Sequence, residues 1–167
     1  MYCFTTCPSP VGLITLASDG ASLAGLWMEG QKYHRNSIPE AMTEKNDLPI
    51  FEQTRQWLDS YFAGEKPAIS ELPLAPIGSA FRQSVWNILR EIPYGKTITY
   101  GEIAKRLGAK SSQAVGGAVG HNPISIIIPC HRVVGANGSL TGYAGGVQAK
   151  SKLLTLEGVD MVGLFAP

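Results

Sequence analysis

The sequence predicts a two-domain α/β protein. Residues 1–75 are expected to form a small α/β domain, an antiparallel sheet with one helix, and residues 76–167 a mainly α winged helix-turn-helix domain. Three observations support this reading. Two apolar runs of strand length lie around a turn signal near the N-terminus, one amphipathic helix follows them, and a proline-rich stretch then leads into a series of short capped helices.

The apolar runs cover residues 11–17 and 23–28, and the turn signal between them is Ser-Asp-Gly at 18–20, a pattern typical of a β-meander. Residues 30–46 are polar and are expected to form a loop.

A helix is predicted next, capped by Asp47 and begun by Pro49, because proline suits the first turn of a helix. Its apolar stripe consists of Ile50, Trp57, Leu58, Tyr61 and Phe62. Gly64 would end this helix, and the prolines within residues 65–78 make that stretch a stiff linker, where we place the domain boundary.

In the second domain, Ser79 is expected to cap a first helix. Its residues spaced for burial are Phe81, Val85, Trp86, Ile88 and Leu89. Thr99 and Glu102 would form the capping box of a second helix over 100–107, which Gly108 ends.

Ser111 or Ser112 would cap a third helix over 113–119. Two helices joined by a short glycine-containing turn are typical of a helix-turn-helix. An Asn-Gly turn at 137–138 would form the wing, and a last helix is expected over 148–156.

The third helix has little side-chain bulk, with Ala114, Gly116, Gly117, Ala118 and Gly120. Each interior glycine destabilises a helix by ~1 kcal/mol relative to alanine. Two explanations are open: the helix packs very closely against another helix, or it offers a smooth surface that enters a groove of duplex DNA.

Composition indicates a globular protein, with 44% hydrophobic and 16% charged residues. Residues 1–78 carry five Lys/Arg and nine Asp/Glu, a net charge of −4, whereas residues 79–167 carry nine and four, a net charge of +5. A charge split of this size does occur by chance in some sequences. The alternative is that the positively charged second half faces a polyanion and the first half does not. The three cysteines are irregularly spaced, so no disulfide framework is expected. The sequence shows neither a signal-peptide pattern nor an apolar run long enough to span a membrane, and we therefore expect a cytoplasmic protein.

The most informative segment is Pro129-Cys130-His131-Arg132, which follows an apolar, strand-like run at 126–128. A thiol is nucleophilic as thiolate, and a free cysteine titrates near pH ~8.5, so a reactive cysteine needs a base or a positive field beside it. A lone cysteine is more often an inert buried residue. The adjacent imidazole and guanidinium favour a reactive one.

With Gly-His-Asn-Pro-Ile at 120–124 before it and Thr-Gly-Tyr-Ala-Gly-Gly at 141–146 after it, this segment resembles the O6-alkylguanine-DNA alkyltransferase family. The runs at 81–86 and 92–101 match as well. The resemblance is strong over residues 75–160 and weak in the first half. It implies a ribonuclease-H-like first domain and DNA repair by direct reversal, in which the alkyl group of an extruded O6-alkylguanine, and also of O4-alkylthymine, moves irreversibly to a cysteine. It further implies alkylated double-stranded DNA as partner, no cofactor and no protein partner, so we expect a monomer.

The resemblance also assigns residues. Cys130 would be the nucleophile, His131 the base acting through a water, Glu157 the group that orients the histidine, and Tyr100 the proton donor to the leaving base. The expected substrate contacts are Asn122, the Val133 carbonyl, the Tyr143 ring and the backbone N–H groups around Ala144. The expected DNA contacts are Gln113, Ala114, Gly117 and Arg132.

Two departures bear on function. Gln113 stands where many relatives have arginine, which predicts weaker base extrusion or duplex affinity, and Ala144 stands where some have serine. Some relatives hold zinc in the first domain, but Cys3, Cys7 and His34 fit no four-ligand pattern, so no metal is expected.

Two other functions are open alternatives. One is a non-reactive lesion sensor, although alkyltransferase-like proteins carry tryptophan at the nucleophile position. The other is a Cys-His thiol hydrolase, which does not need a helix-turn-helix.

Overall fold

The structure is a computed structural model that describes residues 1–109 and 111–167. It divides the chain into two compact units. The first comprises Met1–Ile77 with Pro123–Ile127, and the second comprises Gly78–Asn122 with Ile128–Pro167. The short segment at 123–127, which the sequence analysis placed in the second domain, therefore belongs to the first unit.

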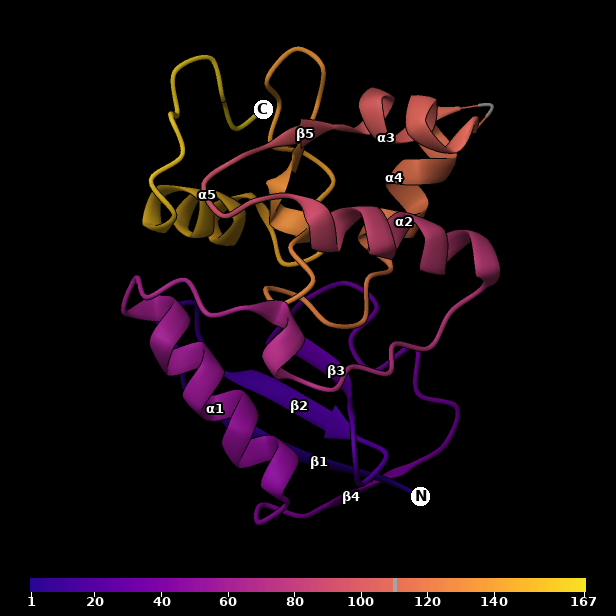
Figure 1. The fold of residues 1–167 in the computed structure, drawn as a ribbon, viewed down its shortest axis with the longest axis vertical. Helices are drawn as coiled ribbons and strands as arrows, with labels where there is room; N and C mark the ends of the chain where they lie inside the picture. The colour runs from indigo at the N-terminus through magenta and orange to yellow at the C-terminus, as the bar shows by residue number, and fades with distance from the viewer. Residues whose placement is uncertain (110) are drawn as a thin grey trace. The chain divides into compact units, whose positions relative to one another are not determined.

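The first unit is built on a four-stranded sheet with the strand order β3-β2-β1-β4 (Figure 1). β1 (Tyr2–Cys7), β2 (Ile14–Ser18) and β3 (Leu23–Met28) form an antiparallel meander, and the two predicted apolar runs provide β2 and β3. β4 (Met42–Glu44) pairs in parallel with β1. Its position was predicted to be a loop, because a three-residue strand without apolar alternation leaves no local signal.

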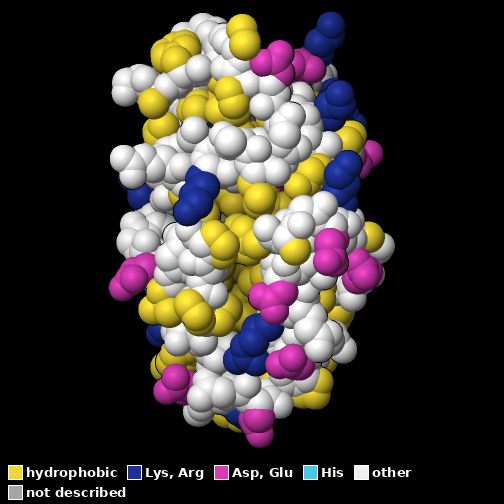
Figure 2. Space-filling model, turned by 90° about the vertical axis from the view of Figure 1, so that its left-hand side faces the viewer, with side chains coloured by type: hydrophobic (Ala, Val, Ile, Leu, Met, Phe, Trp, Pro, Cys, Tyr) yellow, Lys and Arg dark blue, Asp and Glu magenta, His cyan; other side chains and the backbone are white. Residues whose placement is uncertain are grey.

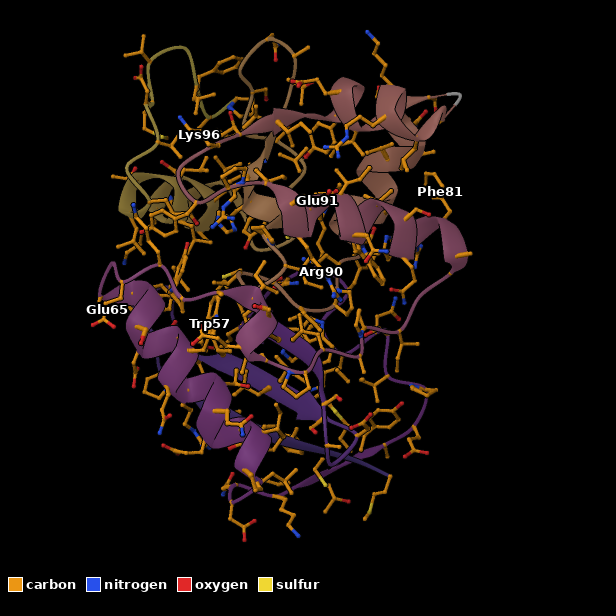
Figure 3. All side chains as sticks on the ribbon, in the orientation of Figure 1. Trp57, Glu65, Phe81, Arg90, Glu91 and Lys96 are labelled. Atoms are coloured by element: carbon orange, nitrogen blue, oxygen red, sulfur yellow. The ribbon has the colours of Figure 1, made fainter. Side chains whose placement is uncertain are left out.

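The helix α1 (Pro49–Phe62) runs along this sheet and includes all five residues of the predicted apolar stripe (Figure 1). The predicted Asp47 cap is wrong: the N-cap is Leu48, which makes no side-chain cap bond, and the helix entry relies on proline in the first turn. Trp57 donates its indole N–H to the Ala68 carbonyl at 2.8 Å, in the segment that follows the helix (Figure 3). The buried residues of α1 are Ile50, Phe51, Thr54, Trp57, Leu58 and Tyr61. The short 3-10 helix η1 (Ile69–Glu71) then leads out of the first unit.

The described residues of the second unit form four α-helices and a two-stranded parallel ladder. The helices are α2 (Ala80–Glu91), α3 (Tyr100–Leu107), α4 (Ser112–Gly120) and α5 (Val147–Leu156). The ladder pairs β5 (Ile98–Thr99) with β6 (Val133–Val134), and β6 directly follows the 3-10 turn η2 (Cys130–Arg132).

The predicted helix caps of this unit are confirmed. Ser79 accepts from the Arg82 N–H, and Thr99 and Glu102 form the capping box. Ser111 caps α4, and Gly108 ends α3 in the left-handed conformation with φ 63°. These local signals fix where α3 ends and α4 begins, and so define the helix-turn-helix.

Two local predictions in the second half are wrong. Phe81 is 39% exposed in the first turn of α2, whereas the other four predicted apolar residues of that helix are buried (Figure 3). The run at 126–128 is not a strand: Ile126 has φ 71°, and the Ile127 N–H donates to the Ser125 carbonyl at 2.8 Å in a γ-turn. This run is buried, and an apolar run without alternation does not distinguish a strand from a buried loop.

Charged side chains of both signs are interspersed on the face of the molecule that Figure 2 shows, with hydrophobic atoms between them. No helix in the described part of the chain is long and apolar enough to cross a lipid bilayer.

Candidate active site

The backbone at Cys130 is held by two hydrogen bonds to one carbonyl. Pro129 has φ −81° and ψ 66°, the geometry of an inverse γ-turn, and the Cys130 N–H donates to the Ile128 carbonyl at 2.8 Å. The Asn122 side chain donates to the same carbonyl, also at 2.8 Å. Cys130 is 3% exposed. The proline and the asparagine therefore place a thiol that is nearly shielded from water at the start of η2.

The next two residues, His131 and Arg132, both bind the carboxylate of Glu157, at the C-terminal end of α5. His131 Nε2 lies 2.6 Å from Glu157 Oε2. Arg132 donates from Nε to Oε1 at 2.8 Å and from Nη2 to Oε2 at 3.1 Å, and its Nη1 donates to the Ile92 carbonyl at 2.7 Å. All three side chains are buried. The structure thus brings together residues that are 26 positions apart in the sequence.

These contacts define the protonation states. Burial alone would raise the pKa of Glu157, but the hydrogen bonds and charges of His131 and Arg132 outweigh burial and hold it well below its usual value. A carboxylate only accepts hydrogen bonds, so His131 Nε2 carries a proton and its Nδ1 carries the lone pair of the neutral ring. Burial lowers the pKa of His131. The hydrogen bond and the charge of Glu157 act in the opposite direction, but burial together with the charges of Arg132 and Lys150 outweighs them, so the imidazole is neutral. A neutral imidazole with an available Nδ1 is a competent base.

A second group of side chains meets at the carbonyl of Thr141. It accepts from the Tyr100 hydroxyl at 3.1 Å and from the Lys150 ammonium at 3.4 Å. Burial, and then the negative charge of ionised Cys130, raise the pKa of Tyr100 to about 12, so its hydroxyl keeps its proton at neutral pH. Gly142 has φ 88°, and a Cβ there would lie 2.7 Å from the Tyr100 hydroxyl, so this close approach requires glycine.

The predicted substrate contacts lie on the segments that flank this network. Val133 is buried and pairs with Ile98 in the parallel ladder. The Tyr143 ring is edge-on to the His131 ring, with 6.5 Å between centroids, and Ala144 next to it is half-buried.

Three of the four predicted DNA contacts share an exposed surface of α4: Gln113, Ala114 and Gly117. The helix is fixed from its other side, where the Trp86 indole donates to the Ala118 carbonyl at 2.8 Å. A Cβ added at Gly117 or Gly120 would meet no atom within 4 Å. Packing within the protein therefore does not require glycine at these positions, which favours the smooth, groove-entering surface over close helix packing.

The fourth predicted DNA contact, Arg132, is placed differently. It is 7% exposed, and its guanidinium is bound to Glu157 and to the Ile92 carbonyl. Its charge belongs to the active-site network and is not presented on the surface.

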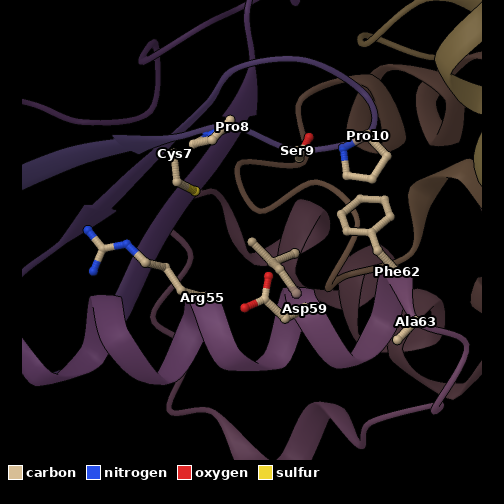
Figure 4. Close-up of a pocket in the computed structure, with 9 residues that line it drawn as sticks. Cys7, Pro8, Ser9, Pro10, Arg55, Asp59, Phe62 and Ala63 are labelled. Atoms are coloured by element: carbon tan, nitrogen blue, oxygen red, sulfur yellow. The ribbon is translucent and has the colours of Figure 1, made fainter.

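Another thiol, Cys7, lies in a cavity of about 490 Å³ in the first unit, between the end of β1 and α1 (Figure 4). Arg55 and Asp59 also line this cavity, and none of its described lining residues is a histidine. Burial raises the pKa of Cys7, so this thiol is neutral at physiological pH. Among the residues that the structure describes, no group of three or more His, Cys, Asp or Glu side chains is placed to hold a metal ion.

Comparison with known proteins divides the chain at nearly the same place, between residues 76 and 80, but assigns residues 123–127 to the second domain. The family model for the 6-O-methylguanine DNA methyltransferase ribonuclease-like domain matches residues 1–76, and the model for the DNA binding domain of the same family matches residues 80–159. The chain belongs to the 6-O-methylguanine DNA methyltransferase family.

Individual family members are similar along most of the chain. The methylated-DNA–protein-cysteine methyltransferase of Haemophilus influenzae is 46% identical over 160 residues, which cover 95% of this chain and 88% of that protein. The protein of the same name from Methanosarcina acetivorans is 50% identical over 152 residues, covering 90% and 94%. The crystal structure of Mycobacterium tuberculosis OGT in complex with DNA superposes with a TM-score of 0.81 at 44% identity, covering 93% of this chain and 91% of that chain.

One residue of this methyltransferase site was missed by the sequence analysis. Lys150 is fully buried within α5, beside Tyr100 and electrostatically coupled to Cys130. A lysine in a helix that also carries the exposed Lys152 is normally read as part of a solvated face. No local pattern marks it, because its burial depends on how α5 packs in the folded unit.

Proposed function

We propose that this chain is a methylated-DNA–protein-cysteine methyltransferase that repairs O6-alkylguanine in duplex DNA by transferring the alkyl group, once and irreversibly, to Cys130. Family membership and the names of the relatives support the activity. The assignment of residues rests on one observation, the buried run in which a cysteine is followed by a neutral histidine that a carboxylate orients. O4-alkylthymine is a second substrate in this proposal, and no cofactor takes part.

The first step is ionisation of the thiol. His131 accepts the thiol proton at Nδ1 through a water, and Glu157 stabilises the resulting imidazolium through its bond to the Nε2–H. Arg132 holds the carboxylate in place with two hydrogen bonds. These residues supply a nucleophile, a base and a group that orients the base.

The second step is alkyl transfer. The sulfur attacks the alkyl carbon, the S–C bond forms as the C–O6 bond breaks, and the electron pair of that bond leaves with guanine. Tyr100 protonates the departing base, and the thiol proton, which His131 has passed to solvent, returns to the tyrosinate. Because ionised Cys130 raises the pKa of Tyr100, the phenol becomes a stronger acid as negative charge leaves the sulfur.

Recognition requires the damaged nucleotide to leave the duplex, which costs a few kcal/mol of unstacking, and less for a mispaired base. In this proposal the base stacks on Tyr143, its exocyclic amine donates to the Val133 carbonyl, and backbone N–H groups near Ala144 face the O6 side. Asn122 connects the end of the helix-turn-helix to the segment before Cys130 through the Ile128 carbonyl.

The α4 helix enters a groove of the DNA through Gln113, Ala114 and Gly117. Gln113 hydrogen-bonds the base left unpaired, but it adds no positive charge, so extrusion is weaker than with arginine. We assign Arg132 to Glu157 and not to a phosphate, because its guanidinium is buried. We also propose that the protein acts as a monomer in the cytoplasm, where reducing conditions maintain its free cysteines.

Intact-mass analysis tests the proposal. After incubation with excess O6-methylguanine duplex, the protein should gain the mass of one methyl group. The gain should be lost in Cys130→Ser and retained in Cys7→Ser, the matched control at a thiol without a base. Tight binding with no gain in mass would identify a lesion sensor, and repeated turnover with unchanged mass would identify a hydrolase. Either result overturns the proposal.

A further inference from the structure

Lys150 carries a buried charge that the steps above do not use. Its side chain is 0% exposed, and within the described residues no carboxylate forms an ion pair with it. Its one hydrogen bond is a long contact of 3.4 Å to the Thr141 carbonyl. Buried charges in proteins are normally paired, because desolvation penalises a lone ion. An ammonium in this position therefore indicates that a negative charge arises nearby.

The charged and titratable groups around Lys150 come from three elements. Tyr100, at the start of α3, presents its ring 6.0 Å from the ammonium. Cys130 and His131 of η2 both interact electrostatically with the lysine. Arg132 of η2 and Glu157, which follows α5, neutralise each other in their bidentate pair. Tyr100 keeps its proton and His131 is neutral, so the thiolate of Cys130 is the anion that can balance Lys150.

We propose that Lys150 is the counterion of the Cys130 thiolate, and that its positive charge maintains the reactive form of the sulfur in a site almost closed to water. Burial lowers the pKa of Lys150 to about 8, while the charge of ionised Cys130 acts in the opposite direction. The lysine is therefore mainly protonated at neutral pH, and the two ionised groups stabilise each other.

The positive charge of Lys150 favours ionisation of the Cys130 thiol but disfavours protonation of His131. Lys150 lowers the pKa of His131, so it favours the thiolate and disfavours a lasting imidazolium. In this arrangement His131 passes the thiol proton on to water, and Lys150, not the imidazolium, is the cation that remains beside the sulfur. Lys150 is a positioning residue, because it acts on the alkyl group only through Cys130.

The test compares Lys150→Met and Lys150→Gln, which remove the charge, with Lys150→Arg, which keeps it. Lys152→Gln is the matched control, since it removes a lysine from an exposed position of the same helix. All variants carry Cys3→Ser and Cys7→Ser, so that Cys130 is the reporting thiol. Two rates are followed by intact mass between about pH 6 and pH 10: carbamidomethylation by iodoacetamide, and single-turnover methyl transfer from O6-methylguanine duplex.

We expect both neutral variants to react about tenfold more slowly at neutral pH and to recover at high pH, with the midpoint of the rate profile moved upward by about one pH unit. Lys150→Arg and Lys152→Gln should keep the original midpoint. A uniform loss of rate at every pH, or an unchanged midpoint in both neutral variants, would mean that the charge does not stabilise the thiolate. The inference rests on Cys130 as acceptor. If the parent protein gained no methyl group from DNA, the proposed function would fail, whereas the iodoacetamide profiles would still test the lysine.

Discussion

If Lys150 is a buried cation, replacing it with methionine should stabilise the folded protein while slowing its reaction. The pKa of Lys150 falls from 10.5 to about 8, so the folded state binds the lysine proton less tightly than the unfolded chain does. That difference in pKa corresponds to about 3 kcal/mol of penalty on the charged form at neutral pH. Methionine has a similar length and carries no charge, and it loses the long contact to Thr141 and the distant interaction of the ammonium with the Tyr100 ring. We expect a gain in unfolding free energy of about 1–3 kcal/mol at pH 7.

The pH dependence identifies the cause of this gain. Below about pH 8 the lysine is protonated in both states, and the penalty is complete. Between about pH 8 and 10.5 the folded state releases the proton that the unfolded chain still binds, so the stability of the lysine protein rises with pH. The advantage of methionine should therefore shrink across this range.

Denaturant unfolding at pH 7 and near pH 10 measures both quantities, with each protein in a Cys130→Ser background so that no thiolate holds the lysine proton at high pH. Lys152→Met, at an exposed position, should change stability by no more than about 0.5 kcal/mol. A methionine variant that is less stable at pH 7, or a difference that does not change with pH, would refute the argument.

Further expectations concern other positions. Glu157→Gln leaves a buried guanidinium without its carboxylate and should lower the unfolding free energy by about 3 kcal/mol at neutral pH. The lowered pKa of Glu157 contributes stability that is complete above the pKa of the unfolded chain and is lost progressively below it, so the difference measured by denaturation should narrow below about pH 4. Gly117→Ala has room for its methyl group and should raise helix stability by about 1 kcal/mol in thermal melts, yet weaken duplex binding measured by fluorescence anisotropy, and unchanged binding would remove α4 from the interface. Gly142→Ala places a Cβ against the Tyr100 hydroxyl at a positive φ, so single-turnover transfer should slow, and a normal rate would contradict the close approach. Finally, S-methylation removes the anion opposite Lys150, so near pH ~8.5 the methylated protein should melt below the unreacted one, and this difference should be absent in Lys150→Met.

The parts of the fold that were predicted correctly are those with local causes. The capping box of Thr99 and Glu102, the serine cap of α4 and the left-handed Gly108 depend on neighbouring residues, and all were found in place. The strand β4 was missed because its pairing with β1 joins segments about 40 residues apart and its sequence carries no apolar pattern. The apolar run at 126–128 was predicted to be strand-like, because a continuous apolar sequence does not distinguish a strand from a loop that the surrounding fold buries.

The same distinction applies to the site. The adjacency of Cys130 and His131 is visible in the sequence, whereas the contact with Glu157 came only from resemblance to a family, since nothing local links a glutamate 26 residues away to the imidazole. Arg132 was expected to contact DNA by resemblance to the family, and the bidentate pair with Glu157 that buries it becomes evident only once α5 is in place. Lys150 left no signal at all, for the same reason.

A comparison of Cys7 with Cys130 shows which surroundings favour ionisation of a buried thiol and which do not. Both Cys7 and Cys130 are at least partly withdrawn from water, and burial by itself disfavours a thiolate. Near Cys7 burial outweighs the charge of Arg55, and Asp59 opposes ionisation further. Around Cys130, in the proposed mechanism, a neutral histidine receives the proton and a lysine balances the remaining charge, while the glutamate bound to that histidine is itself paired with Arg132. If the proposal is correct, the reactivity of a cysteine in this protein depends less on the exposure of its sulfur than on whether a buried positive charge lies close enough to balance the thiolate.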